Sequence, residues 1–575
     1  MATGVKEKPE ELGRVIAVYG RSIVRFAVSE EKMPLVSKPG AYVKMENPEK
    51  SGQWLYAMVV SFNLLDELYR RSRIVEELEG YLEFRPARNE LIATIVGFGK
   101  PQSVMRGVPF LPRPGQKVYL ALEEELARIM GSGDIELGVL SFNEKVPFTL
   151  SLNKLCSRHF AVLAMTGAGK SNTVAVILAS ILEKYPYARI ILVDTHSEYV
   201  PLAEKYGNVR VLSPAGRIAR LVEARYGLKP KQLEIPLWTL SLEEIASILK
   251  LDPSRATKQI MYLRNALQEV RRSRYSPAST DDPIFFTAEE LRNAIAGQGG
   301  RDRSLDDLLL KYDSMLENTE LRYITRPSWS NEAYESRSED EPYRSVNTYL
   351  EVYGEILKPG LSIVALGGLP SEAQASTTAT ILRAIWRLIG AGVLAGVALP
   401  TLLIVEEAHN YAPHGRWSPA RAILEKIAKE GRKFGIGLGI VSQRPRELSQ
   451  TLLAQCGTLI ALRTANPEDQ RHILSSMEDI MKEMVEGLSG LSTGEALVSG
   501  PAAPLPAIVK VYNFQSRYRV ALGGKDVDWA RVWSEAPAEA DLTPYLISEI
   551  EEGVGEGKAG SGGRKRLDSS MESFF

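Results

Sequence analysis

The chain has 575 residues, enough for roughly three to four domain-sized units. Hydrophobic residues make up 44% of it, so large cores can form, and the formal net charge of −1 gives no global signature of nucleic-acid binding. Basic residues that hold a nucleic acid would therefore have to be gathered locally, as in the lining of a ring. The two cysteines, Cys156 and Cys456, exclude a disulfide scaffold and fit a reducing cytoplasm, and the five histidines lack the spacing of zinc ligands.

The N-terminus has no apolar signal segment, but one later stretch has the composition of a membrane span. Leu388 to Val405 covers eighteen residues without a charge. Pro400 and several small residues interrupt it, and Glu406 and Glu407 follow directly. We interpret this stretch as a helix end, a turn and a buried parallel strand, and we expect a cytoplasmic protein without stable membrane insertion.

Residues 10 to 150 have the composition of a β-rich region. Short runs rich in Val, Ile, Tyr and Phe are separated by turns with Gly, Pro or Asn, and one helical pattern, Leu64–Leu82, interrupts them. Strands at this spacing predict a small barrel, in which we find no catalytic constellation. The expected strands are Gly13–Tyr19, Ser22–Val28, Ala41–Met45, Trp54–Phe62, Leu91–Phe98, Lys117–Leu120 and Ile135–Leu140.

A phosphate-binding loop follows within His159 to Val174. A short apolar strand leads into a glycine-rich turn, and a helical pattern begins at the junction. The turn directs backbone N–H groups at an anion, and the positive end of the helix points to the same place. Lys170 would reach the β- and γ-phosphates of ATP, and the Ser171 hydroxyl would hold Mg²⁺. The first glycine of the usual motif is Ala164 here, which we interpret as a tolerated variant. The expected nucleotide-binding residues are Thr166, Gly167, Ala168, Gly169, Lys170, Ser171 and Asn172.

From residue 155 onward, strands alternate with helical patterns, which predicts a parallel α/β sheet. The strand Ala188–Val193 ends in a polar run from Asp194 to Tyr199 that includes Glu198. Such residues either face a ligand at the carboxyl edge of the sheet or simply cap the strand, and the sequence does not decide between the two.

Residues 230 to 345 look like an insertion of short helices. Capping boxes at Ser241 and Thr287 mark two helix starts, and Asp252-Pro253 marks a third. The longest helix, Pro253 to Arg272, is basic, so it either meets DNA or presents a solvated face. We expect 297–344 to be polar and loop-rich. The basic residues of the helix are Arg255, Lys258, Arg264, Arg271 and Arg272.

The α/β pattern resumes with the strand Leu361–Leu366 and a helix that we expect Ser371 and Gln374 to cap. Thr401–Val405 is then a hydrophobic strand that ends in Glu406 and Glu407, a Walker B pattern expected beside the phosphate-loop strand. Glu406 would organise the Mg²⁺ shell, in a place usually held by Asp, and Glu407 would orient the attacking water.

The strand Gly435–Val441 ends at Ser442-Gln443-Arg444-Pro445, where Gln443 could bond the γ-phosphate or the water. The pattern predicts further strands at Leu459–Leu462 and within 495–513. The tail beyond residue 551, rich in Gly, Ser and Glu, is expected to be disordered.

Taken in order, MTGAGKSNT, VDTHSEY, LPSEAQ, IVEEAHNYAP, EGRKFGIG and VSQRP resemble the archaeal HerA family, hexameric DNA-translocating ATPases related to FtsK. The resemblance covers nearly the whole chain and is most specific in the core motifs. It implies a RecA-like ATPase core at 151–230 and 346–514, a β-barrel at 1–150 and a helical insertion at 231–345. It also implies a C-terminal brace at 515–550, with a disordered tail at 551–575.

The resemblance further implies a homohexameric ring that threads double-stranded DNA and resects broken ends with the nuclease NurA. In that family the arginine of EGRKFG acts as a finger from the adjacent subunit, which here is Arg432. The glutamine of VSQRP, here Gln443, resembles a γ-phosphate sensor. From the residues alone, the alternative is that Arg432 is a surface arginine that caps a helix C-terminus.

Two other functions remain open at this point. One is a conjugation-type ATPase that pumps DNA across a membrane. The other is a non-translocating scaffold that binds ATP and recruits a nuclease. A scaffold would need neither Glu407 nor Arg432, and ATP turnover with and without duplex DNA separates the alternatives.

Overall fold

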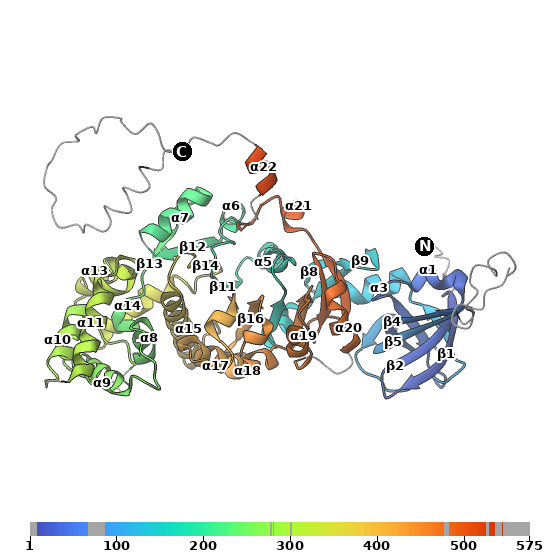
Figure 1. The fold of residues 1–575 in the computed structure, drawn as a ribbon, viewed down its shortest axis with the longest axis horizontal. Coiled ribbons are helices and arrows are strands. Elements are labelled where there is room, and N and C mark those ends of the chain that lie inside the picture. The colour runs from blue at the N-terminus through green and yellow to red at the C-terminus, as the bar shows by residue number, and fades with distance from the viewer. Residues whose placement is uncertain are drawn as a thin grey trace.

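The computed structural model of the chain describes residues 9–66, 87–214, 216–276, 279, 281–299, 302–476, 482–524, 528–534 and 543. Most of the expected helix Leu64–Leu82, half of the expected brace and the whole tail from residue 551 lie outside these residues. A barrel, a central α/β body and a helical region follow one another along the longest axis of the molecule (Figure 1).

The N-terminal sheet closes into the predicted small barrel. Its strand order is β2-β1-β7-β3-β4-β5-β6, and β2 also pairs with β5, which joins the two ends. Side chains of alternate residues fill the interior, among them Phe26, Val43, Leu55 and Ile95. The strands are β1 (Glu11–Tyr19), β2 (Ile23–Val28), β3 (Tyr42–Glu46), β4 (Trp54–Asp66), β5 (Ala87–Lys100), β6 (Ser103–Met105) and β7 (Lys117–Leu120).

The expectation that Ile135–Leu140 belongs to the barrel is wrong. This segment is β8, which pairs with β19 (Ala507–Val511) and with β9 (Asn143–Leu150) in the larger sheet. Its buried residues, such as Ile135 and Leu137, join the hydrophobic cluster of the central body. A strand's alternation pattern gives its buried face and does not identify its partner, so the sequence could not place β8.

The central sheet has the order β13-β12-β14-β11-β15-β16-β10-β17-β18-β19-β8-β9. Pairing is parallel from β13 to β17 and antiparallel from β17 to β9. The bounds that complete this sheet are β10 (Phe160–Leu163), β11 (Arg189–Asp194), β12 (Val209–Pro214), β13 (Lys231–Leu233), β14 (Gly360–Ala365), β15 (Thr401–Val405), β16 (Ile436–Ser442), β17 (Thr458–Leu462) and β18 (Glu495–Ser499).

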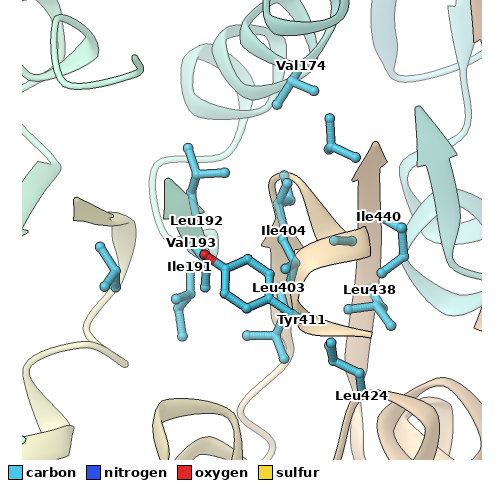
Figure 2. Packing of buried hydrophobic residues seen from close by; sticks show 14 of the residues in the cluster. Val174, Ile191, Leu192, Val193, Leu403, Ile404, Tyr411, Leu424, Leu438 and Ile440 are labelled. Atoms are coloured by element: carbon cyan, nitrogen blue, oxygen red, sulfur yellow. The ribbon is translucent and has the colours of Figure 1, made fainter. Parts of the chain in front are cut away.

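Helices cover both faces of the parallel strands, because nearly every residue of those strands is apolar and buried. Figure 2 shows side chains of β11, β15 and β16 between Val174 of α5 (Lys170–Lys184) and Leu424 of α17 (Pro419–Phe434). The labelled strand residues are Ile191, Leu192, Val193, Leu403, Ile404, Leu438 and Ile440. The predicted fold class, an α/β P-loop core with a barrel and a helical insertion, is confirmed.

Between β13 and β14 the chain forms the helical region. Both predicted capping boxes are present, at the starts of α8 (Leu242–Ile248) and α10 (Ala288–Ala296). The expected start at Asp252 is wrong, since α9 (Thr257–Arg272) begins five residues later and Asp252 caps a turn instead. The loop-rich interpretation of 297–344 is also wrong. This stretch contains α11 (Arg303–Glu317), α12 (Arg322–Thr325), α13 (Trp329–Glu335) and the start of α14 (Tyr343–Gly354).

The charge-free stretch divides as expected into the end of α15 (Ser371–Leu394), a turn and the buried strand β15. In the described part of the chain, α15 is the one helix long and apolar enough to cross a membrane, and half of its most apolar window is buried in the protein. Its N-cap is Pro370, so the expected cap by Ser371 and Gln374 is not formed. Gln374 instead donates to the carbonyl of Leu366, 2.9 Å away.

The remaining helices are short connections around the two sheets. They are α1 (Met33–Val36), α3 (Glu123–Met130), α4 (Leu152–Ser157), α6 (Leu202–Lys205), α7 (Arg217–Tyr226), α16 (Ala408–Tyr411), α18 (Gln450–Ala454), α19 (Pro467–Leu474), α20 (Lys482–Glu486), α21 (Phe514–Tyr518) and α22 (Trp529–Ser534).

Candidate nucleotide-binding site

The loop between β10 and α5 has the backbone of an anion nest. Gly167 and Gly169 have φ of +77° and +106°, values that only glycine adopts without strain. Ala164 is fully buried and is not among the residues with positive φ, so its methyl group fits where the usual motif has glycine. The amino end of α5 therefore points its N–H groups at the space above the loop.

Lys170, the first residue of α5, forms an ion pair with Glu407, which lies just after the end of β15. Both side chains are largely buried, at 11% and 2% exposed. Glu407 has φ of +47°, which turns its carboxylate out of the strand direction and toward the phosphate loop. Its second oxygen, Oε2, is buried without a hydrogen bond and lies 3.4 Å from His409 Nδ1.

Ser171 donates a hydrogen bond to Glu198 Oε2 over 2.8 Å. Glu198 belongs to the polar run after β11, and the structure brings it to the phosphate loop. Asp194 shapes that run, because its two carboxylate oxygens accept the backbone N–H groups of Glu198 and Tyr199 at 3.0 and 2.9 Å. The sequence left open whether these residues cap the strand or face a ligand. Asp194 caps the strand end, and Glu198 faces the phosphate loop.

Glu406 lies beneath this site, next to Asp194. Burial and the charge of Asp194 raise the pKa of Glu406 well above its ordinary value. Burial also raises the pKa of Asp194 to about 6, although two backbone N–H groups oppose the shift. Glu406 Oε2 is buried without a hydrogen-bond partner. A positive charge is therefore favoured between these carboxyl groups.

These oxygens suit Mg²⁺. The ion prefers hard oxygen ligands and is usually held in nucleotide sites by one or two protein groups plus phosphates. The Ser171 hydroxyl and the free oxygen of Glu406 are such groups. Within the described residues no cluster of three or more His, Cys, Asp or Glu side chains is arranged to hold a metal ion by itself. The donors thus fit an ion that arrives with phosphates.

Gln443, at the end of β16, meets the phosphate loop directly. Its Oε1 accepts a hydrogen bond from Thr166 Oγ1 over 2.7 Å. In the sheet, β16 lies between β10 and β15. The expectation that the Walker B strand lies beside the phosphate-loop strand is therefore wrong, and the strand that carries Gln443 takes that place. Glu407 reaches Lys170 across it.

Asn172 lies in the first turn of α5, and its side chain contacts the C-terminal part of the chain. Its amide donates to the carbonyl of Tyr512 over 2.9 Å, and its oxygen accepts the N–H of Phe514 over 2.7 Å. The backbone N–H of Gly523 also donates to the carbonyl of Glu198, over 2.8 Å. The segment after β19 thus packs against the phosphate loop, and no pattern in the sequence predicts this contact.

Arg432 lies at the opposite edge of the sheet. It is exposed near the end of α17, and within the described residues its side chain has no hydrogen bond or ion pair. It lines a cavity of about 520 Å³ together with the first residues of three parallel strands, Arg189, Thr401 and Ile436. The phosphate loop lies at the other ends of these strands, so Arg432 does not join the residues of its own site.

Comparisons with known proteins agree with this geometry. The family described as "Helicase HerA, central domain" matches residues 135–385. A DNA double-strand break repair helicase HerA of Pyrococcus furiosus is 30% identical over 84% of this chain and 88% of its own length. A probable helicase of Methanocaldococcus jannaschii is 32% identical over 74% of this chain and 75% of its own length.

Among solved structures, VirB4 of Thermoanaerobacter pseudethanolicus is similar with a TM-score of 0.49 and 16% identity, over 66% of this chain and 96% of that one.

Proposed function

Since this chain belongs to the HerA family of helicases, we propose that it is an ATP-driven motor that translocates along double-stranded DNA and works in double-strand break repair. It assembles as a homohexamer, acts in the cytoplasm and passes broken ends to a NurA-like nuclease for resection. The observation that carries the proposal is the convergence of Lys170, Ser171, Glu407 and Gln443 from three elements at one edge of the sheet.

The arrangement supports ATP hydrolysis. The backbone N–H groups of the phosphate loop and the Lys170 ammonium bind the β- and γ-phosphates. Glu407 takes its role when phosphate replaces it as the partner of Lys170, because its carboxylate then becomes free to orient and polarise a water. Gln443, hydrogen-bonded to Thr166, is positioned to exchange that bond for one to the γ-phosphate or the water.

Ser171 and Glu406 hold Mg²⁺ in this proposal, and the ion supplies charge neutralisation between the phosphates. Glu406 is suited to this role because a cation offsets the cost of ionising its buried carboxyl group. Arg432 then completes the site of a neighbouring subunit, since it faces away from its own phosphate loop. In this proposal each ATP site is completed by the arginine of a neighbouring subunit, so hydrolysis requires the ring.

ATP turnover measured with and without duplex DNA, and with and without the candidate nuclease, tests the proposal. A motor requires DNA-stimulated hydrolysis, and DNA binding that falls steeply with salt but does not depend on sequence. Turnover that DNA leaves unchanged would contradict a motor and favour a nucleotide-binding scaffold. Sequence-selective binding at physiological salt would contradict it in favour of a regulatory protein.

A further inference from the structure

An exposed loop joins α16 to α17 on the carboxyl side of the central sheet. We call residues 412–418 the Arg416 loop. His414, Gly415, Arg416 and Trp417 are exposed at its tip, and Trp417 is 45% exposed. Several aromatic side chains of the described residues are at least as exposed, so the feature of interest is that Trp417 directly follows an exposed arginine on the same loop. Within the described part of the chain the Arg416 side chain has no hydrogen bond or ion pair.

The loop is held in place at its base. His414 donates its backbone N–H to the carbonyl of Glu447 over 2.7 Å, and Ser449 donates to the carbonyl of Ala412 over 2.8 Å. Pro413 and Leu448 form an antiparallel bridge between these contacts. The Arg421 guanidinium donates to the carbonyls of Pro413 and Arg416 at 3.1 and 3.3 Å. The cation and the indole are therefore presented by an ordered backbone.

The same base connects the loop to the nucleotide site by two routes. Glu407 precedes α16, whose four residues lead straight into the loop. Gln443 directly follows β16, and the segment after it carries Glu447 and Leu448, the loop's partners. Short covalent segments therefore join the base of the Arg416 loop to both Glu407 and Gln443.

Nearby cations differ from Arg416 in having partners. Arg444 pairs with Glu447 at 3.4 Å, and Arg446 pairs with Glu468 at 2.9 Å. These pairs are exposed and screened, so they cost little to open toward a stronger anion. The Arg416 loop and the neighbouring segment together present the unpaired guanidinium of Arg416, the indole of Trp417 and two guanidinium groups in exposed ion pairs. A polyanion with apolar sugar faces matches this combination.

The basic helix α9, the other DNA-contacting candidate, uses much of its charge within the protein. Arg271 is fully buried and donates to the carbonyls of Trp238 and Leu240 at 3.2 and 2.9 Å. Lys258 lies 3.6 Å from Asp302. In Figure 1, α9 lies in the helical region at one end of the molecule, away from α17 and α18 below the central sheet. The helix is therefore a weaker candidate than the loop.

We propose that the Arg416 loop contacts the sugar-phosphate backbone of double-stranded DNA, with Arg416 bound to phosphate and Trp417 packed on the adjoining sugar. The inference rests on the proposed function and names the part of the surface that meets DNA. Because both contacts are to the backbone, they carry no sequence preference and suit a protein that slides.

The test uses the full chain with Arg416→Ala, Trp417→Ala and Trp417→Phe, and Arg272→Ala on α9 as the matched exposed arginine. Binding of two labelled duplexes of unrelated sequence is measured by anisotropy across a salt series. Arg416→Ala should weaken both equally, roughly fivefold at about 0.15 M salt, and lower the salt slope by about one per contact. Basal ATP turnover should stay unchanged while DNA-stimulated turnover falls.

Tryptophan emission gives an independent readout. DNA should change the emission of the wild-type protein, and Trp417→Phe should remove that change although the other tryptophans remain. The inference is overturned if Arg416→Ala and Trp417→Ala bind DNA as the wild type does, or if Arg272→Ala weakens binding as much. It is also overturned if the variants lose DNA only because the assembly changes size. A wild-type protein that binds no DNA would instead contradict the proposed function itself.

Discussion

Lys170 and Glu407 form a nearly buried ion pair that links the phosphate loop to the end of β15. In the proposed mechanism each of the two has another task, Lys170 on the phosphates and Glu407 on the water. ATP must therefore separate them, and the pair competes with ATP for the lysine.

Two substitutions distinguish these tasks. Lys170→Ala should abolish tight ATP binding, because the phosphates lose their flexible cation. Glu407→Gln should retain or strengthen binding, because it weakens the competitor for Lys170, while hydrolysis falls by on the order of 10²-fold or more. Isothermal titration and single-turnover hydrolysis measure the two effects. Normal turnover in Glu407→Gln would remove the assigned role of that carboxylate.

His159, directly before β10, is a buried histidine, and we expect its protonation to make the stability of the protein depend on pH. Its Nδ1 accepts the N–H of Leu438 at 3.0 Å, so the proton is on Nε2, 3.1 Å from the carbonyl of Ala428. Burial lowers the pKa of His159 below 6.5. The neutral ring is favoured in the folded state, so its contribution to stability is full above pH 6.5 and is lost as pH falls through the folded-state pKa.

The buried carboxyl groups of Asp194 and Glu406, whose pKa values are raised, act in the opposite direction over this range, so we expect the effect of His159 as a difference between proteins. As pH decreases from about 7 to 5, the unfolding temperature of the wild type should fall relative to that of His159→Asn. Asparagine tolerates the left-handed backbone at this position, where φ is +56°, and it cannot be protonated. Calorimetry across the pH range measures the slope of the unfolding temperature against pH, with the exposed His196→Asn as control. An unchanged slope in His159→Asn, or an equal reduction in the control, would remove His159 as the cause.

The barrel should be removable without loss of the nucleotide site, provided the cut respects the sheet. Deleting residues 1–121 keeps β8 and β9, whereas deleting 1–150 removes two strands from the central sheet. The shorter deletion leaves Glu125 without Lys44, its buried partner at 2.6 Å, so it should carry Glu125→Gln. We expect this protein to bind ATP and to lose the nuclease.

Pull-down with the nuclease and ATP titration of both truncations check the expectation. Deletion of 1–150 should lose ATP binding as well, through unfolding of the sheet edge. Full nuclease affinity in the protein without residues 1–121 would place docking outside the barrel.

Much of the fold follows from the sequence where burial is uniform. Thr401–Val405 and Lys117–Leu120 have the bounds predicted for them, because apolar runs between turn residues have one reasonable interpretation. In α11 the buried residues Leu305, Leu308, Tyr312 and Met315 keep a helical period, but the charged residues between them concealed it. The polar composition of this stretch therefore predicts a loop, whereas the spacing of its apolar residues predicts the helix that forms.

The sequence predicts which strand ends supply residues to the candidate site, but it does not predict which side chains pair with each other there. Glu407 and Gln443 each follow a buried strand, so their convergence on the phosphate loop follows from parallel topology. The pairing of Ser171 with Glu198 depends on how Asp194 folds a five-residue turn. The hydrogen bond between Asn172 and Tyr512 depends on a segment 340 residues away in the sequence. Neither has a periodic signal.

Arg432 leads to the sharpest prediction. It is exposed at the amino edge of the parallel strands, while its own phosphate loop is at the carboxyl edge. As a helix C-terminal cation it would contribute less than about 1 kcal/mol to stability and nothing to hydrolysis. As a finger in a neighbouring site it would raise hydrolysis by roughly 10³-fold or more, through stabilisation of charge in the transition state.

Mixing two inactive proteins separates these roles. Lys170→Ala subunits keep the arginine, and Arg432→Ala subunits keep the phosphate loop. In mixed rings some interfaces combine the two intact halves, so ATP hydrolysis should reappear on mixing and reach its maximum near equal amounts. Lys433→Ala, which alters the adjacent cation, should stay active alone and serves as the control. Mixed rings that assemble but remain as inactive as either parent would show that Arg432 does not act across the interface.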